Sequence, residues 1–86
     1  MIIYLHNDFE KRYSKLNKKE REKCKTRLNL FRIDPFSPLL NNHPLHGIYE
    51  GYRSINIGGD LRAIYKLTQK DVAMFIAIGT HAHLYE

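Results

Sequence analysis

The sequence predicts an α+β fold of the order β-α-α-β-β-β, with a helical hairpin packed on a mainly antiparallel four-stranded sheet. Two observations support this fold class. Two helix-start patterns, each an Asn followed three residues later by a Glu, stand close together near the N-terminus. Three strand-like segments separated by short turns then fill the second half. With 86 residues, of which 43% are hydrophobic, the chain is expected to form a single domain with a buried core, residues 1–86.

The first strand and the first helix follow from the N-terminal residues. Residues 1–5 are aliphatic and aromatic enough for a strand. Asn7 with Glu10 then resembles a helix start, in which the Asn side chain caps the first turn. The apolar residues that follow recur at helical spacing and form one stripe: Phe9, Tyr13 and Leu16.

The same pattern predicts a second helix. Asn17 with Glu20 opens it, and Pro35 ends it, because proline disfavours a helical conformation in the residue before it. Its apolar stripe is Cys24, Leu28 and Phe31, and Lys and Arg occupy its other faces. The two helices therefore form a hairpin with basic charge on its outer side.

The second half of the chain is predicted to be a loop followed by three strands. The loop covers residues 41–47, and the strands cover about 48–57, 61–67 and 72–78. Gly58-Gly59 is expected to supply the positive φ angles of a tight hairpin turn. A polar turn at 68–71 joins the last two strands.

The net charge of +5 is concentrated in the predicted hairpin. Ten of the 14 Lys and Arg lie between Lys11 and Arg32, and residues 1–33 carry ten basic against four acidic groups. Such asymmetry is typical of a face that binds a polyanion or an acidic partner. A merely solvated helix face is the alternative, and charge alone does not separate the two.

The chain is expected to be cytoplasmic and to have no membrane contact. Its one cysteine, Cys24, has no intrachain partner for a disulfide, which fits a reducing compartment. The residues at the N-terminus lack the basic and long apolar regions of a signal peptide. No apolar run approaches the roughly 20 residues that span a bilayer.

Two histidine pairs flank the predicted strands. His81 and His83 follow the last strand, and His43 and His46 precede Gly51-Tyr52-Arg53. Histidine both accepts and donates protons near neutrality, so these pairs predict a site. Zinc binding by the four imidazoles is a rival interpretation, but structural zinc sites usually include cysteine. No metal and no cofactor are therefore expected.

Several spaced motifs of this chain together resemble those of the RelE/ParE toxin superfamily, and most of all its YafQ-type endoribonucleases. They stand in the family's order: His43-Pro44-Leu45, Gly51-Tyr52-Arg53, Ile64-Tyr65-Lys66-Leu67 and Gly79-Thr80-His81-Ala82. The resemblance implies the toxin of a type II toxin–antitoxin pair, which cleaves mRNA on the translating ribosome without a metal. It also implies a cognate antitoxin protein as a partner, beside mRNA and ribosomal RNA.

Cleavage of RNA without a metal needs a base for the ribose 2′-hydroxyl and an acid for the departing 5′-oxygen. His81 matches the histidine of the family's Gly-Thr-His-Ala tail and is expected to be the general acid. His43 matches a second family histidine and is expected to be the base or a phosphate donor. Asp60 matches an acidic family position and is the other candidate base, although turn aspartates are common for backbone reasons alone.

Further residues are expected to support the transition state or to bind RNA. Arg53 is a candidate phosphate clamp, since a guanidinium matches phosphate geometry. Arg62 and Lys66 share one side of a strand, and they are expected to add to a polar face shared with Arg53. Tyr85 corresponds to the family's terminal aromatic, which would stack on a splayed base.

The chain departs from the family pattern at two positions. Asn56 stands where the YafQ-type pattern usually has a histidine, and Ser54 stands where an acid is common. Asparagine binds phosphate or base but transfers no proton. Two other functions therefore stay open, a ParE-like gyrase inhibitor without nuclease activity and a catalytically weak RNA-binding homologue of the toxin.

Overall fold

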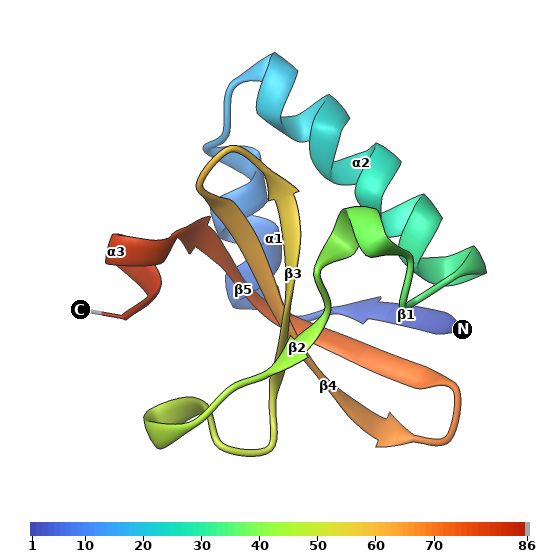
Figure 1. Cartoon of the computed structure of the whole chain (residues 1–86). Coiled ribbons are helices and arrows are strands. Elements are labelled where there is room, and N and C mark those ends of the chain that lie inside the picture. The colour runs from blue at the N-terminus through green and yellow to red at the C-terminus, as the bar shows by residue number, and fades with distance from the viewer. Residues whose placement is uncertain (86) are drawn as a thin grey trace.

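The computed structural model describes residues 1–85 and contains one mixed sheet (Figure 1). The main elements are β1 (Ile2–Leu5), α1 (Asn7–Ser14), α2 (Lys18–Ile33), β2 (His43–Pro44), β3 (Arg53–Gly58), β4 (Leu61–Gln69), β5 (Val72–Thr80) and α3 (His81–Leu84). The strand order is β1-β5-β4-β3-β2, in which β1 runs parallel to β5 and the other pairs are antiparallel. The predicted α+β class and element order are therefore confirmed.

The sheet has five strands instead of the expected four. The additional strand, β2, consists of two residues in the predicted loop, and Pro44 suits it because proline is tolerated on edge strands. The expected strand 48–57 begins only at Arg53, since Gly47–Tyr49 forms a 3₁₀ turn instead. The short helix α3 follows directly after β5, and the sequence pattern did not predict it.

The helix starts were predicted correctly at α2 and one residue late at α1. At α2, Asn17 accepts a hydrogen bond from the Glu20 amide while the Glu20 side chain accepts one from the Asn17 amide, which is a complete capping box. At α1 the cap is His6, whose Nδ1 accepts from the amide of Asp8 at 3.1 Å. Asn7 is already the first helical residue.

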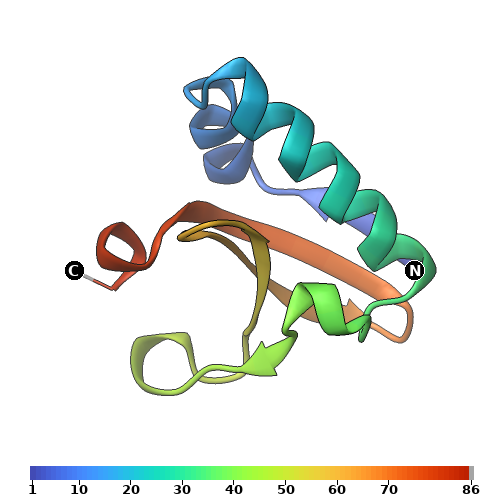
Figure 2. The ribbon, with the colours of Figure 1, turned by 45° about the horizontal axis from the view of Figure 1, so that its top comes forward.

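One face of the sheet is covered by α1 and α2, as Figure 2 shows. The core lies in this layer and is rich in aromatic rings. The ring centroid of Phe31 is 4.8 Å from that of Tyr65 and 5.2 Å from that of Phe75, both in edge-to-face geometry. Cys24 is fully buried beside them, and desolvation by burial raises the pKa of its thiol to about 12.

The hairpin turn between β3 and β4 needs its two glycines for different reasons. Gly59 has a φ of +54°, as expected for a tight turn. Gly58 has no positive φ, which corrects the expectation for that residue. A Cβ at Gly58 would lie 3.0 Å from Cε of Lys23, so Gly58 leaves room for the side chain that Lys23 extends from α2 over the turn.

The opposite face of the sheet carries a smaller apolar cluster that leaves part of the face open. Its buried members are Leu45, Ile64 and Leu84, with Tyr49, Tyr52, Ile76, Ala77 and Tyr85 packed against them. The cluster joins the segment before β3, the middle of β4 and the helix α3.

Within residues 1–85, none of the helices combines the length and apolarity needed to cross a membrane.

Candidate functional site

Strand register gathers polar side chains on the open face of the sheet. His43 pairs with Ser54 across β2 and β3, and Asn56 pairs with Arg62 across β3 and β4. Paired residues in antiparallel strands project to the same face, and so do residues two apart on one strand. Ser54, Asn56 and Arg62 therefore form a contiguous polar patch, with His43 at its β2 side.

Three buried polar atoms in this patch have no hydrogen-bond partner: Oγ of Ser54, Oδ1 of Asn56 and Nε of Arg62. Ser54 is only 1% exposed. A buried polar group without a partner costs stability, and native structures retain few of them. Asn56 and Arg62 are half-buried as residues, so a rotation of their side chains would bring these unpaired groups to a polar ligand that completes their hydrogen bonds.

His43 is held by the residue two positions before it. Its Nδ1 lies 2.7 Å from the carbonyl oxygen of Asn41. A carbonyl oxygen only accepts, so Nδ1 carries the proton in the neutral ring and Nε2 bears the lone pair. Asn41 has a left-handed φ of +46°, a conformation that asparagine tolerates. The ring thus presents its unprotonated nitrogen away from the backbone, as a general base requires.

His81 is the first residue of α3, which Thr80 caps by accepting a hydrogen bond from the His83 amide at 3.2 Å. Its exposed ring lies over Tyr85, with ring centroids 4.7 Å apart. Tyr85 in turn packs edge-on against Tyr49 at 5.6 Å. Desolvation and the Tyr49 hydroxyl raise the pKa of Tyr85, and the charge of Arg62 opposes them, so Tyr85 stays a neutral phenol at neutral pH.

Close packing of α3 over β5 depends on Gly79. A Cβ at this position would lie 3.1 Å from Cδ2 of His83 and 3.6 Å from Cδ2 of Leu84. Gly79 pairs with Arg62, so the missing side chain leaves room above the polar patch for α3. The glycine of the Gly-Thr-His tail therefore helps to place His81 beside the patch.

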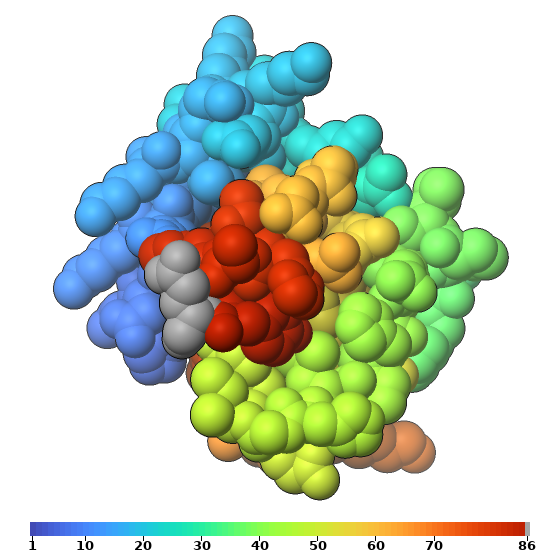
Figure 3. Space-filling view, turned by 60° about the vertical axis from the view of Figure 1, so that its left-hand side comes forward, coloured from blue at the N-terminus to red at the C-terminus, as the bar shows by residue number. Residues whose placement is uncertain are grey.

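Asp60 lies in the exposed turn between β3 and β4. Its neighbour Leu61 pairs with Thr80, the residue before His81, so the turn and α3 lie at the same end of the sheet. Figure 3 shows this end: α3 in red lies at the centre, with the β3–β4 turn above it and the green segment near residues 40–50 below it. The turn thus borders the patch without forming part of it.

Arg53 does not join the patch, contrary to the expectation of a shared face. It pairs with Tyr65, a core residue on the helix-covered side, and its Nε donates to Oδ1 of Asn42 at 2.8 Å. Its guanidinium lies over the ring of Phe36, 5.3 Å from the centroid. Strand alternation explains the placement, because Arg53 lies one residue before Ser54 and so points the other way.

Lys66 lies on the open face, two positions beyond Ile64 on β4. Its Nζ lies 5.4 Å above the ring of Tyr52. The side chain is exposed, while Ile64 between it and Arg62 is fully buried. The face that Arg62, Ile64 and Lys66 share is therefore mixed in polarity, and Lys66 extends it along the strand.

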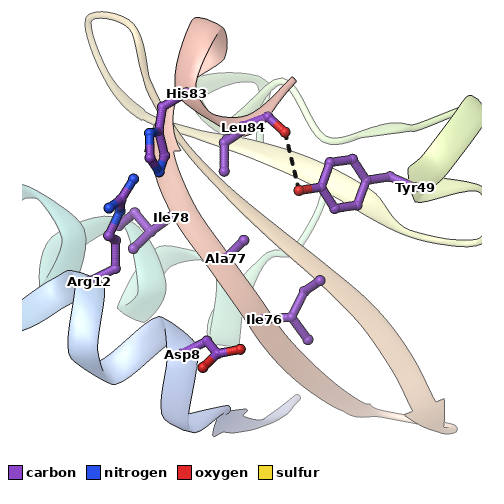
Figure 4. A pocket seen from close by; sticks show the side chains of 8 residues that line it. All are labelled: Asp8, Arg12, Tyr49, Ile76, Ala77, Ile78, His83 and Leu84. Carbon is purple, nitrogen blue, oxygen red and sulfur yellow. Dashed lines mark hydrogen bonds between the residues drawn. The ribbon is translucent and has the colours of Figure 1, made fainter. Parts of the chain in front are cut away.

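The remaining histidines point elsewhere. His46 is exposed and lies 3.5 Å from a carboxylate oxygen of Glu50. His83 faces a cleft of about 380 Å³ between α1 and β5, where its ring and the guanidinium of Arg12 approach each other from opposite sides (Figure 4). Among residues 1–85 no three His, Cys, Asp or Glu side chains are grouped to hold a metal ion. The rival zinc site therefore has no geometric support.

Acidic side chains among residues 1–85 do not neutralise the basic charge of α1 and α2. In residues 1–85 the ion pairs are those of His6 with Asp8, at 3.7 Å, and of His46 with Glu50. No Lys or Arg in this range pairs with an acid. The helical hairpin thus presents cationic side chains that have no acidic partner among residues 1–85, which favours a polyanionic or acidic partner.

The family is decided by comparison with known proteins. A family model described as the bacterial toxin of type II toxin-antitoxin systems, YafQ, matches residues 1–86. The chain belongs to the YafQ toxin family. The curated mRNA interferase toxin YafQ of Escherichia coli strain K12 is 41% identical over 51 residues, 59% of this chain and 54% of that protein. The chain thus spans about half the length of the curated relatives that it matches.

Solved YafQ structures share the whole fold. The crystal structure of YafQ from E. coli strain BL21(DE3) superimposes with a TM-score of 0.81 at 30% identity, over 98% of this chain and 97% of that one. The E. coli DinJ-YafQ toxin-antitoxin complex gives a TM-score of 0.78 at 31% identity, over 98% and 96% of the two chains. The fold similarity therefore extends well beyond the motif-bearing half.

Within the YafQ fold, two residues of this site carry only weak sequence signals. Ser54 stands two residues before Asn56 on one strand, and this spacing is the signal that places its hydroxyl in the patch. Asn42 bonds Arg53 and Tyr65, yet nothing in a loop sequence indicates such a long-range network. The role of Asn42 is recognised only from its side-chain hydrogen bonds in the structure.

Proposed function

We propose that this YafQ family member is an mRNA interferase, the toxin of a type II toxin–antitoxin pair that cuts mRNA on the translating ribosome. One observation carries the proposal: unpaired buried polar atoms of Ser54, Asn56 and Arg62 lie between β2, which bears His43, and α3, which bears His81. A scissile phosphate on this patch would complete their hydrogen bonds. The mRNA interferase YafQ of E. coli, with its related sequence, supports the same activity.

In the proposed reaction His43 accepts the proton of the ribose 2′-hydroxyl on Nε2. The 2′-oxygen attacks phosphorus, and the bond from phosphorus to the 5′-oxygen breaks as that oxygen takes a proton from His81. The products are a 2′,3′-cyclic phosphate and a 5′-hydroxyl. The guanidinium of Arg62 stabilises the charge on the phosphorane, because a fixed cation in a partly dry site acts strongly on developing negative charge.

The other expected residues receive supporting roles. Tyr85, stacked on His81 and neutral, offers a surface for an unstacked base. Lys66 lies beyond the patch and contacts the RNA backbone. The orientation of His43 supports it as the base. Asp60, in the turn at the same end of the sheet as α3, would then orient groups near α3. Asn56 binds the phosphate or a nucleobase of the RNA. Because asparagine transfers no proton, this enzyme is predicted to cleave more slowly than a relative with histidine at this position.

Two partners follow from the charge distribution. The lysines and arginines on the surface of α1 and α2 suit ribosomal RNA, through contacts with phosphate that carry no sequence preference. The same surface would attract an acidic segment of a cognate antitoxin. The DinJ-YafQ complex of E. coli supports an antitoxin partner for this chain.

The test is to produce the wild type, His81→Ala and His83→Ala in a translating extract and to map the ends of mRNA. His83 lies in the same turn of helix but faces the cleft of Figure 4, so it is the matched control. Cuts in phase with codons are expected from the wild type and from His83→Ala, and none from His81→Ala. Equal cutting by all three, or inhibited DNA supercoiling with intact mRNA, would overturn the proposal. Binding of RNA without cleavage would favour the catalytically weak homologue.

A further inference from the structure

A hydrogen-bond network centred on Asn42 lies behind His43, on the helix-covered side of the sheet. Nε of Arg53 donates to Oδ1 of Asn42 at 2.8 Å. Nδ2 of Asn42 donates to the hydroxyl of Tyr65 at 2.8 Å and to the carbonyl oxygen of Pro35 at 2.9 Å. The network therefore joins β3, β4 and the loop that follows α2.

The chemistry of its partners fixes the orientation of the Asn42 amide. A guanidinium only donates, so it requires Oδ1, and a carbonyl only accepts, so it requires Nδ2. Both N–H groups and the oxygen of the amide are thereby used. Rotating the amide would put donor against donor at Arg53 and acceptor against acceptor at Pro35.

The network is anchored in the core. Tyr65 is 2% exposed, and its ring packs against those of Phe31 and Phe75 at 4.8 and 5.1 Å. Arg53 is held a second time by its stacking over Phe36. Asn42 is consequently attached to rigid parts of the protein on three sides.

The hydrogen bonds of Asn42 also hold the backbone of its neighbours, residues 41 and 43. Asn42 directly precedes His43, whose backbone is paired with Ser54. Asn41 directly precedes Asn42 and accepts the Nδ1 proton of His43 through its carbonyl oxygen. The direction of that carbonyl is set at Asn41, which has a left-handed φ of +46°, and the next residue, Asn42, is held by its three side-chain hydrogen bonds.

We propose that Asn42 and Arg53 are positioning residues of the proposed ribonuclease, which hold His43 with Nδ1 protonated and Nε2 free for the 2′-hydroxyl. The proposal rests on the proposed function for the reaction, but its structural half, the state of the imidazole, stands on its own. Arg53 then acts on the substrate only through His43. This replaces the phosphate clamp that its sequence position indicates.

The first test is ¹⁵N NMR of the histidine side chains in the free protein, which needs no activity. The wild type is expected to show neutral His43 as the Nδ1-protonated tautomer. Asn42→Ala is expected to give a mixture of both tautomers. Asn42→Asp should give a tautomer ratio between those of the wild type and Asn42→Ala, because the carboxylate still accepts from Arg53 but no longer donates to Pro35. Arg27→Ala is the matched control, since Arg27 donates to the Leu39 carbonyl in the same loop without touching Asn42.

The second test is cleavage kinetics of the same variants. Misplacing a catalytic group by about 1 Å costs roughly 10²-fold, so Asn42→Ala and Arg53→Ala are expected to lower kcat about 10- to 100-fold with KM unchanged. If Arg53 were a phosphate clamp, Arg53→Ala would raise KM and weaken the salt dependence of RNA binding, and the proposal would be wrong. An unchanged His43 tautomer in folded Asn42→Ala would also overturn it. Absence of cleavage by the wild type would refute the proposed function and leave the tautomer result valid.

Discussion

Asn56 and Arg62 lie opposite each other on β3 and β4, yet neither Oδ1 of Asn56 nor Nε of Arg62 has a hydrogen-bond partner. A fold selected for stability alone would pair them or replace them with apolar side chains. Groups kept unpaired in a binding face are typical of functional sites, where the ligand completes the hydrogen bonds. The cross-strand pair therefore links the sheet register to the proposed phosphate site.

Arg62→Met is predicted to lower activity and to raise stability. Methionine keeps much of the arginine's length but removes the buried unpaired Nε, whose desolvation costs on the order of 1 kcal/mol. It also removes the charge proposed for the transition state, so kcat should fall about 10²-fold. Urea unfolding and cleavage assays measure the two effects.

Lys66→Met is the control for the stability effect, because Lys66 lies on the same face of the same strand but is exposed. It should leave the free energy of unfolding within about 0.5 kcal/mol of the wild type. A lower stability for Arg62→Met than for this control would show that Arg62 is satisfied within the fold.

Much of the fold was predictable because local signals agreed with the tertiary structure. The Asn17–Glu20 capping box and the apolar stripe with Cys24 and Phe31 give α2 nearly its true length. Two features escaped prediction for physical reasons. β2 exists only through its pairing with β3, which two residues cannot signal, and α3 forms because Gly79 lets the chain fold back over the sheet.

For the candidate site, the sequence predicted the strand face of some residues and not of others. Residues two apart on one strand share a face, which places Arg62 and Lys66 correctly. Arg53 lies two residues before Ile55, whose buried side chain belongs to the helix-covered core, so strand alternation places Arg53 on that face as well. Sequence motifs indicated His43 and His81 as candidates, while the hydrogen bonds of Asn42 with Arg53 and Tyr65 became visible only in three dimensions.

Cleavage should require both the ribose 2′-hydroxyl of the substrate and the proposed general base, His43. A substrate with a single 2′-deoxynucleotide at the cut position is predicted to be bound normally and left intact. His43→Ala should likewise bind RNA and cut it at least about 10²-fold more slowly, the usual contribution of a general base. Mass spectrometry of wild-type products should find a 2′,3′-cyclic phosphate or its hydrolysed form. A 5′-phosphate end would contradict attack by the 2′-hydroxyl.

Gly79→Ala is predicted to reduce activity by displacing α3. The new Cβ would lie 3.1 Å from Cδ2 of His83, so that ring must give way, and we expect its movement to displace the helical turn that bears His81. Because a shift of about 1 Å in a catalytic group costs up to roughly 10²-fold, a measurable loss of kcat is expected. His83→Ala removes the clashing ring, and the double variant should regain most of the activity. Lack of rescue would place the cost of Gly79→Ala elsewhere.

Burial of Cys24 makes stability depend on alkaline pH. Burial raises the pKa of this thiol from 9.0 to about 12, so its stabilising contribution is complete below pH 9.0 and is lost as the pH rises towards 12. At about pH 10.5 the wild type should have lost roughly 2 kcal/mol through this group, a loss that Cys24→Ala cannot show. Urea unfolding at pH 8 and pH 10.5 should therefore find the stability difference between the two proteins smaller or reversed at the higher pH. A constant difference would mean that the thiolate is tolerated in the core.

The unpaired cations of the helical hairpin should dominate the salt dependence of RNA binding. The test uses the His81→Ala background, so that RNA is bound but not cut, and replaces three exposed α2 lysines, Lys18, Lys19 and Lys25, by glutamine. Each lost phosphate contact lowers the slope of log K against log salt by about 0.7 for single-stranded RNA, so a decrease of up to roughly 2 is expected. Lys70→Gln, in the turn between β4 and β5, should leave the slope unchanged. If it lowers the slope as much as the α2 variant does, the hairpin is not the RNA-binding surface.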